Sequence, residues 1–239
     1  MDARISPDTG FGSIPFEQNP VRWMERSEAF ARPRQQRSRE RLERVVTSAV
    51  ALFAKRGFEA TRMTDIASHA QVPVGTVYQH FADKDALLGA IVQSYRACRM
   101  QEIHDLCTSA EARAASPAEL VRLHLDIVFS AFTCDAGLLR LIERMRLENS
   151  AVHREQSGAN ETVAGLIADR LIEKLPGRDP VQLRRQVFYL HSIIRGAVVW
   201  SVLPTGGELG AGLQVTDNSF AQEALLMSLR YLALEEQPT

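Results

Sequence analysis

Cysteine is scarce in this chain: Cys98, Cys107 and Cys134 are the 3 cysteines among 239 residues. They have no paired spacing of the kind found in zinc or redox motifs, and three cysteines cannot all pair within one chain. His104 lies one helical turn before Cys107, but no further ligands are evident around them. We therefore expect no metal site and no cofactor, and a reducing, cytoplasmic environment.

Long apolar runs are also lacking. The longest, residues 187–203, is interrupted by His191 and Arg195, and it is short for a membrane span of about 20 apolar residues. No apolar run follows the first charged residues, so we expect no signal peptide. We interpret residues 187–203 as a helix buried in protein and expect no membrane partner.

The sequence shows no alternating strand pattern and no internal repeat. Its composition, 45% hydrophobic and 24% charged, is ordinary for a globular protein. Acidic and histidine residues are plentiful, yet no spacing indicates an acid/base pair, a nucleophile or a phosphate-binding glycine loop. These absences predict an all-α protein that is not an enzyme.

Residues 1–33 are rich in proline, glycine, serine and asparagine without a period, and we expect a mobile N-terminal tail. Helical periodicity starts after them. Gly57 is expected to end the first helix, with Phe58 folding back onto its last turn. The apolar stripe of this helix recurs at i, i+3, i+4, i+7, i+10 and i+11: Leu42, Val45, Val46, Ala49, Leu52 and Phe53.

Two very short helical patterns follow, separated by residues 71–73. Helices this short are marginal in water and need tertiary support. Two of them joined by a tight turn and supported by a longer first helix describe a helix-turn-helix. We place a three-helix domain at residues 34–99, with the motif at about 62–81. The second short pattern has the apolar residues Val74, Val77, Tyr78 and Phe81.

Residues 100–239 are expected to form a second helical domain. The sequence Ser-Pro-Ala-Glu at 116–119 is typical of a capping box that opens a helix. Asp179 and Pro180 open another helix, which continues into residues 187–203. His191 and Arg195 either line a ligand cavity in this domain or lie at the dimer interface. His124 and Phe129 are further candidates for the cavity, although core packing is the stronger explanation for both.

The second helix of a helix-turn-helix enters the major groove with residues near its N-terminus. Gly75 permits a close approach, Thr76 and Gln79 can contact base edges, and the Tyr78 hydroxyl can reach a phosphate. Lys84 combines a positive charge with free backbone N–H groups, which suits phosphate. The predicted DNA-binding residues are Arg62, Thr64, Val74, Gly75, Thr76, Tyr78, Gln79, His80 and Lys84.

Charge is unevenly distributed, although the formal net charge is −1. Residues 32–62 hold nine basic and three acidic residues, a net charge of +6, which leaves −7 for the rest. Such a segment can be an anion-binding face or a solvated helix face. Because neutralised phosphates supply most non-specific affinity for DNA, it favours DNA binding over an ordinary helical bundle. Arg34, Arg37 and Arg39 can form an arm along the DNA backbone or into the minor groove.

The segment from Leu52 to Leu88, LFAKRGFEATRMTDIASHAQVPVGTVYQHFADKDALL, resembles the DNA-binding domain of the TetR (tetracycline-repressor) family of bacterial regulators. The resemblance covers roughly residues 38–99. The shared residues are Phe53, Gly57, Phe58, Thr61, Asp65, Ile66, Ala67, Val72, Gly75, Thr76, Tyr78, Phe81, Lys84 and Leu87.

Two residues depart from the family pattern. The family usually has glycine in the turn where this chain has Gln71, which must accept whatever backbone conformation the turn requires. Position 62 is often Ser or Thr, which caps the helix, and here it is Arg62. We expect a neighbour to supply the cap and Arg62 to add a possible phosphate contact.

The resemblance implies a homodimer that pairs through its last two long helices, and a small-molecule effector held between the C-terminal helices. It also implies a repressor that leaves its double-stranded DNA operator when this ligand binds. The run 187–203 and the helix around Phe220, Leu225, Leu226 and Leu229 suit the dimer contact. The alternative is a helical ligand-binding or scaffold protein that no longer reads DNA.

Overall fold

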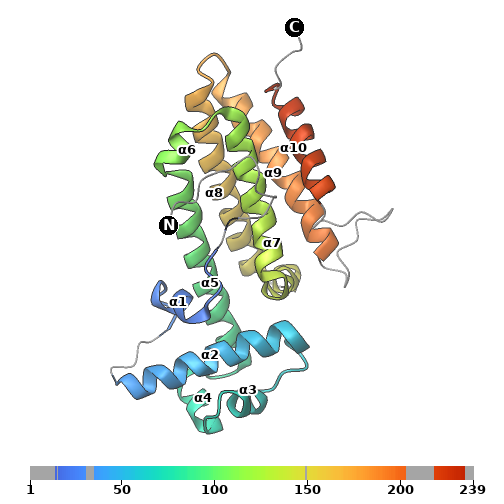
Figure 1. Cartoon of the computed structure of the whole chain (residues 1–239). Helices are drawn as coiled ribbons and strands as arrows, with labels where there is room; N and C mark the ends of the chain where they lie inside the picture. Colours follow the sequence, from blue (N-terminus) through green and yellow to red (C-terminus); the bar gives the residue numbers. More distant parts are fainter. Residues whose placement is uncertain (1–13, 15, 31–34, 149, 203–217, 235–239) are drawn as a thin grey trace. The chain divides into compact units, whose positions relative to one another are not determined.

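The regular elements of this protein are α-helices. The computed structural model describes residues 14, 16–30, 35–148, 150–202 and 218–234, and these ranges contain no strand (Figure 1). The all-α prediction is therefore confirmed for the described chain. The helices are α1 Pro20–Glu25, α2 Gln36–Arg56, α3 Met63–His69, α4 Val74–His80, α5 Lys84–Cys107, α6 Ala110–Ala114, α7 Pro117–Glu148, α8 Ser150–Lys174, α9 Pro180–Val202 and α10 Asn218–Tyr231.

Contacts divide the chain into two units. The N-terminal unit comprises residues 17–101 and 137–144, and the C-terminal unit comprises residues 1–16, 102–136 and 145–239. The sequence-based boundary between residues 99 and 100 therefore falls inside α5, close to the change of unit. The N-terminal unit is larger than the domain predicted at residues 34–99. It also contains residues 17–33 and the part of α7 at residues 137–144.

The predicted apolar stripe of α2 forms the core of the N-terminal unit. All six of its residues are buried, and Val45 and Ala49 have no exposed surface. Ile66 of α3, Val77 of α4 and Leu87 of α5 are likewise fully buried, so each short helix contributes an anchor to this core. Burying a side chain of this size contributes about 1.5–3 kcal/mol, which supplies the tertiary support that seven-residue helices need.

The N-terminal segment departs from the expected tail. Residues 20–25 form α1, which Asn19 caps by accepting a hydrogen bond from the Val21 N–H at 3.0 Å. Trp23 is only 2% exposed and packs edge-on against Tyr95 of α5, with the ring centroids 5.1 Å apart. Its indole Nε1–H donates to the Glu17 carbonyl at 2.7 Å. The proline, glycine and serine of this segment suggested a tail, but its few large apolar residues pack against the rest of the N-terminal unit. Residues 1–13, 15 and 31–33 lie outside the described ranges.

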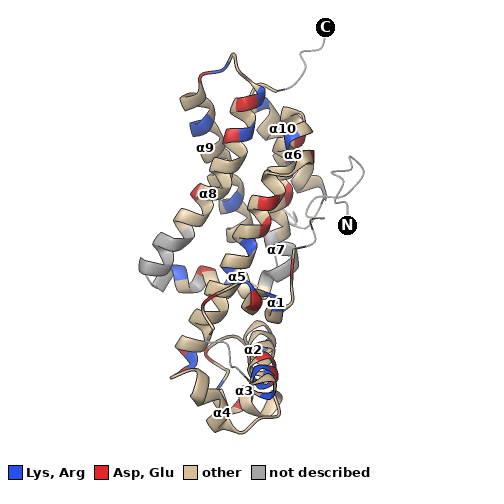
Figure 2. Ribbon diagram, turned by 90° about the vertical axis from the view of Figure 1, so that its left-hand side faces the viewer, with Lys and Arg blue, Asp and Glu red and all other residues tan. Residues whose placement is uncertain are grey.

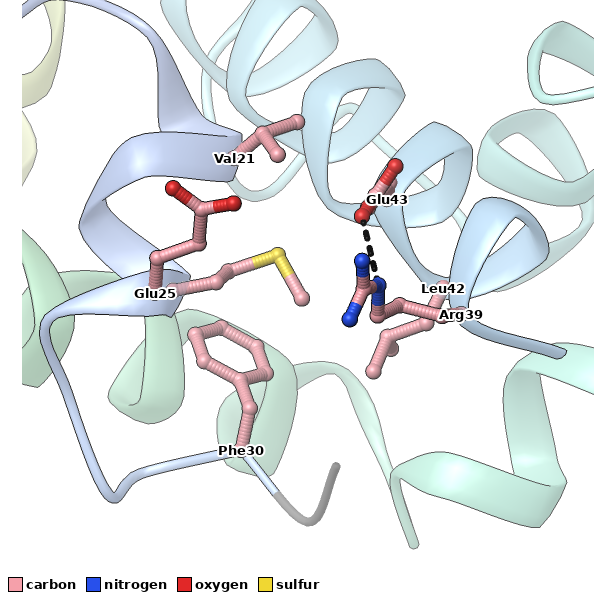
Figure 3. Close-up of a pocket in the computed structure, with 7 residues that line it drawn as sticks. Val21, Glu25, Phe30, Arg39, Leu42 and Glu43 are labelled. Carbon is pink, nitrogen blue, oxygen red and sulfur yellow. Dashed lines mark ion pairs between the residues drawn. The ribbon is translucent and has the colours of Figure 1, made fainter. Parts of the chain in front are cut away.

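A small cavity lies between α1 and α2. Its volume is about 240 Å³, and Figure 3 shows residues of α1 and the following segment facing residues of α2 across it. Its walls are mostly apolar, and Arg39 and Glu43 form an ion pair at its edge, with Nε and Oε1 3.6 Å apart. The lining residues are Val21, Met24, Glu25, Phe30, Arg39, Leu42 and Glu43.

The C-terminal unit is built on α8 and α9. Both bury one apolar face, with Leu171 of α8 and Leu183 and Val198 of α9 having no exposed surface. The end of α10 is tied to α9, because the Gln186 Nε2–H donates to the Tyr231 carbonyl at 3.2 Å. Within the described ranges, no helix is long and apolar enough to cross a bilayer.

Helix α7 is continuous from Pro117 to Glu148. Its start confirms the predicted capping box: the Ser116 N–H donates to Glu119 Oε2 at 2.7 Å, and the Glu119 N–H donates to Ser116 Oγ at 3.3 Å. The helix belongs to the C-terminal unit up to residue 136 and to the N-terminal unit at 137–144. At the second segment, a Cβ added to Gly137 would lie 2.9 Å from Ala54 Cβ.

Candidate nucleic-acid interface

The loop from α2 to α3 is locked by local contacts. Gly57 ends α2 with φ 82° and ψ 165°, a region that is open essentially to glycine alone. Phe58 then folds back onto Phe53, with ring centroids 5.4 Å apart, as predicted. The Thr61 hydroxyl donates to the Gly57 carbonyl at 2.8 Å. These contacts fix the point at which α3 begins.

Helix α3 begins after Arg62, which occupies the cap position. The Arg62 side chain makes no capping hydrogen bond. The neighbouring Asp65 supplies only the reverse half of a capping box, because its Oδ2 accepts from the Arg62 N–H at 2.9 Å and not from a free N–H of the helix. The Arg62 side chain and Thr64 are both exposed. Two of the predicted DNA-binding residues therefore lie on the surface at the start of α3, with the positive end of the helix beside them.

The turn between α3 and α4 contains a left-handed residue. Gln71 has φ 55°, and the N–H of the next residue, Val72, donates to the Ala67 carbonyl at 3.0 Å. This is the hydrogen bond of a helix that closes through a left-handed residue. The side chain of Gln71 is exposed, so no packing compensates for the conformation.

Helix α4 is rotated relative to the stripe that we predicted. Val77 is fully buried and Phe81, just after the helix, is 6% exposed, whereas Val74 and Tyr78 are 41% and 53% exposed. Thr76, predicted to face outward, is only 8% exposed; that prediction is wrong. The i, i+4 pair Val77 and Phe81 sets the inward direction, and Phe81 is held there by an edge-on contact with Phe30, whose ring centroid lies 6.0 Å away.

The exposed face of α4 consequently carries Val74, Gly75, Tyr78 and Gln79. A Cβ added at Gly75 would have no heavy atom within 4 Å, so the backbone is open to close approach there. His80 is half-buried, and this burial lowers the pKa of its imidazole below 6.5. At neutral pH His80 therefore offers a hydrogen bond rather than a positive charge.

Lys84 lies at the start of α5, where Asp83 caps the helix by accepting the Ala86 N–H at 2.7 Å. Its ammonium group donates to the Phe58 carbonyl at 2.7 Å and lies 4.1 Å from the centroid of the Phe58 ring. Lys84 therefore connects α5 to the loop after α2. Its charge is available to a phosphate only in addition to this structural bond, so a substitution here disturbs the fold as well as the surface.

Comparison with known proteins agrees with this geometry. Residues 45–91 match the tetR family of bacterial regulatory proteins. The HTH-type transcriptional repressor KstR of Rhodococcus jostii is 42% identical over 150 residues, which cover 62% of this chain and 68% of that repressor. The chain belongs to the TetR family.

Other relatives of this TetR-family chain are matched over shorter lengths. It is 30% identical over 115 residues to the regulator YerO of Bacillus subtilis, covering 47% of this chain but only 39% of YerO. A solved TetR-family structure from Mesorhizobium loti has the same fold, with a TM-score of 0.55, 22% identity, and coverage of 84% of this chain and 98% of that one.

The segment at residues 16–30, which we had predicted to be a mobile tail, packs against the TetR-family helix-turn-helix and α5. Phe30 packs on Phe81, and Trp23 packs on Tyr95, so the segment touches both the end of α4 and the body of α5. The signal available in the sequence was the occurrence of large apolar residues in an otherwise polar stretch: Phe16, Trp23, Met24 and Phe30 are each 7% exposed or less.

Two buried histidines face each other in the C-terminal unit of this TetR-family protein. His124 Nε2 of α7 lies 2.9 Å from His191 Nδ1 of α9, and the rings stack at an interplanar angle of 11°. Burial lowers the pKa of His124 to about 4, and burial together with the neighbouring His124 lowers the pKa of His191 still further. His124 and His191 lie in the packed interior, where they are 3% and 5% exposed, and both rings are therefore neutral at pH 7.

We predict that the Gln71 turn is strained. Replacing Gln71 with glycine should raise the free energy of unfolding by about 0.5–1 kcal/mol, because relief of roughly 1–2 kcal/mol of left-handed strain exceeds the roughly 0.5–1 kcal/mol that glycine costs through chain entropy. Ser68→Gly, at an exposed right-handed position of α3, should instead lower it by about 1 kcal/mol. Urea unfolding measures both; equal destabilisation by the two substitutions would contradict the strain.

The histidine pair predicts loss of stability in acid. Both pKa values are lowered by folding, so the unfolded chain takes up protons first as the pH falls below about 6.5, and the folded state loses stability between pH 6.5 and the folded pKa values. From pH 6.5 to 5, His124 alone should account for roughly 2 kcal/mol.

A double variant, His124→Gln with His191→Gln, should therefore lose about 3–4 kcal/mol less than the parent over this interval in urea unfolding experiments, because each histidine contributes about half. His104→Gln, at an exposed histidine of α5, is the control and should behave as the parent. An identical pH dependence in the parent and the double variant would show that the pair titrates normally.

Proposed function

We propose that this protein is a transcriptional regulator that binds double-stranded DNA through α4 and releases it when a small molecule binds. The observation that carries the proposal is the exposed face of α4: Gly75, Tyr78 and Gln79 project from a helix whose opposite side is buried. A helix presented in this way fits the major groove, and its N-terminal residues contact the base edges.

The proposed division of roles follows the exposure of each residue. Gln79 is exposed on the groove-facing side and can pair with an adenine through its amide. Tyr78 is exposed beside it and can donate its hydroxyl to a phosphate. Arg62 and Thr64, at the start of α3, are placed for backbone contacts. Thr76 and Lys84, which are buried or bonded within the fold, are assigned to supporting this surface.

Binding to an operator is the first test. Once genomic fragments retained by the protein define an operator, Gln79→Ala should weaken binding by about 1–3 kcal/mol and relax the sequence preference at one base pair. Gln93→Ala, which removes the same side chain from an exposed position of α5, should leave binding unchanged. Fluorescence anisotropy with operator and single-base variants measures both effects.

Two results would contradict this assignment. If the parent protein retains no genomic duplex at any salt concentration, the regulator proposal fails and a ligand-binding or scaffold role takes its place. If the parent binds but Gln79→Ala keeps its affinity and sequence preference, α4 is not the reading element.

We further propose that two copies pair through α9 and α10. Tyr189, Ile193 and Trp200 of α9 are 56%, 58% and 74% exposed and lie on one side of the helix, at i, i+4 and i+11. Leu226, Met227 and Tyr231 add an exposed apolar surface on α10, each more than 40% exposed. So much exposed apolar surface on two neighbouring helices is typical of an interface. Two-fold pairing would present two copies of α4 to the two half-sites of an operator.

If two copies pair through α9 and α10, a charge introduced into this interface should convert the dimer into a monomer. Ile193→Glu places a charge in the proposed interface and should shift the protein from dimer to monomer in sedimentation at micromolar concentration, because a buried unpaired charge is strongly unfavourable. Gln93→Glu adds the same charge on α5 and should remain dimeric. A parent protein that is already monomeric would refute the interface.

The proposed effector acts by a shift of population. A ligand can move the protein away from DNA only to the extent that it binds the DNA-incompetent arrangement more tightly. The C-terminal helices are the proposed location of this ligand and the cytoplasm the proposed site of action. Repression is the proposed outcome, in keeping with the repressor KstR of Rhodococcus jostii.

A further inference from the structure

Helix α2 carries its arginines on two different sides. Arg37, Arg41 and Arg44 recur at i, i+4 and i+7, so they project within about 60° of one another. All three are exposed. Arg39 projects from another side, where it pairs with Glu43 at the edge of the cavity next to α1. Arg37 and Arg39 thus belong to α2 and not to the arm that we expected, and Arg39 is no longer assigned to DNA; Arg34 lies outside the described residues. We call the surface of Arg37, Arg41 and Arg44 the arginine flank.

The same helical register places the arginine flank on the α3 side of α2. The next position in the series is Ser48, at i+11 from Arg37. Ser48 is buried, and its Oγ lies 2.9 Å from Nδ1 of His69 in α3. Core residues such as Val45 and Ala49 lie between this flank and the side that α1 covers. The flank therefore adjoins the helix-turn-helix, whereas Arg39 faces away from α3.

The charges of the flank are not used within the described part of the fold. In those ranges the structure records no hydrogen bond or ion pair for Arg37, Arg41 or Arg44, while Arg39 has Glu43 as a partner. The acidic Glu40 is bonded to Gln36, with Nε2 and Oε1 3.1 Å apart. Figure 2 shows both charge types along α2. Glu43 lies on the side of Arg39, whereas Glu40 lies one helical turn from both Arg37 and Arg44 and borders the arginine flank.

We infer that the arginine flank is a second DNA-binding surface that neutralises phosphates of the strand beside α3, while α4 lies in the groove. The inference rests on the proposed DNA binding and assigns it a further contact. In a helix-turn-helix complex the first helix of the motif crosses the backbone, so a flank that adjoins α3 lies close to phosphate. From Arg37 to Arg44 the helix rises roughly 10 Å, about the axial rise of three phosphates on one strand.

The salt dependence of binding tests this inference without knowledge of the operator. The probe is a 30-base-pair duplex of random sequence, and the dissociation constant is measured by fluorescence anisotropy between about 50 and 200 mM NaCl. Each lost phosphate contact should reduce the slope of log affinity against log salt by about 0.9. The variant Arg37→Gln, Arg41→Gln, Arg44→Gln should therefore reduce the slope by about 2.7.

Arg41→Gln and Arg39→Gln form the matched pair, because each removes one arginine from the same helix. Arg41→Gln should reduce the slope by about 0.9, and Arg39→Gln should leave it unchanged. Thermal melting checks that every variant is folded. If the parent binds and the two single variants have equal slopes, or the triple variant keeps the parental slope, the arginine flank is not a phosphate contact. If the parent itself fails to bind any duplex, it is the proposed function that fails.

Discussion

The proposed DNA-binding surface is formed by α3 and α4, two helices that are too short to be stable in isolation. Helices α3 and α4 have seven residues each, about half the length at which an isolated helix becomes stable in water. Their geometry is therefore set by what they bury: Ile66 for α3, and Val77 with Phe81 for α4. Because these anchors fix the rotation of each helix, the core of the N-terminal unit decides which residues reach DNA in the proposed complex.

The rotation of α4 shows the limit of periodicity in so short a helix. Two apolar patterns fit helical spacing equally well over so few residues. One is Val74, Val77, Tyr78 and Phe81, and the other is Val77 and Phe81 alone. The choice between them is made by long-range contacts, in particular by Phe30 against Phe81. Residue spacing carries no information about such a long-range contact. For this reason Thr76 was predicted to be exposed, whereas it is buried in the structure.

Longer elements and caps were predictable because their signals are local. The α2 stripe, the Gly57 stop and the capping box at 116–119 each depend on residues within a few positions of one another, and each is confirmed. Helix α1 was not predictable in the same way, because six residues carry too little periodicity and its anchor, Trp23, is held by Tyr95, which lies 72 positions later in the sequence. The intramolecular bond of Lys84 to Phe58 was missed for the same reason.

Helix α7 supplies residues to both units, and a different constraint acts on it in each. In the C-terminal unit it carries His124, whose ring stacks on that of His191 in α9. In the N-terminal unit it carries Gly137, where an added Cβ would lie 2.9 Å from Ala54 Cβ of α2. Protein interiors are packed too closely to absorb such a contact without a shift of the neighbouring atoms. Glycine is therefore required at position 137 by the close approach of α2, and not by an unusual backbone conformation of α7.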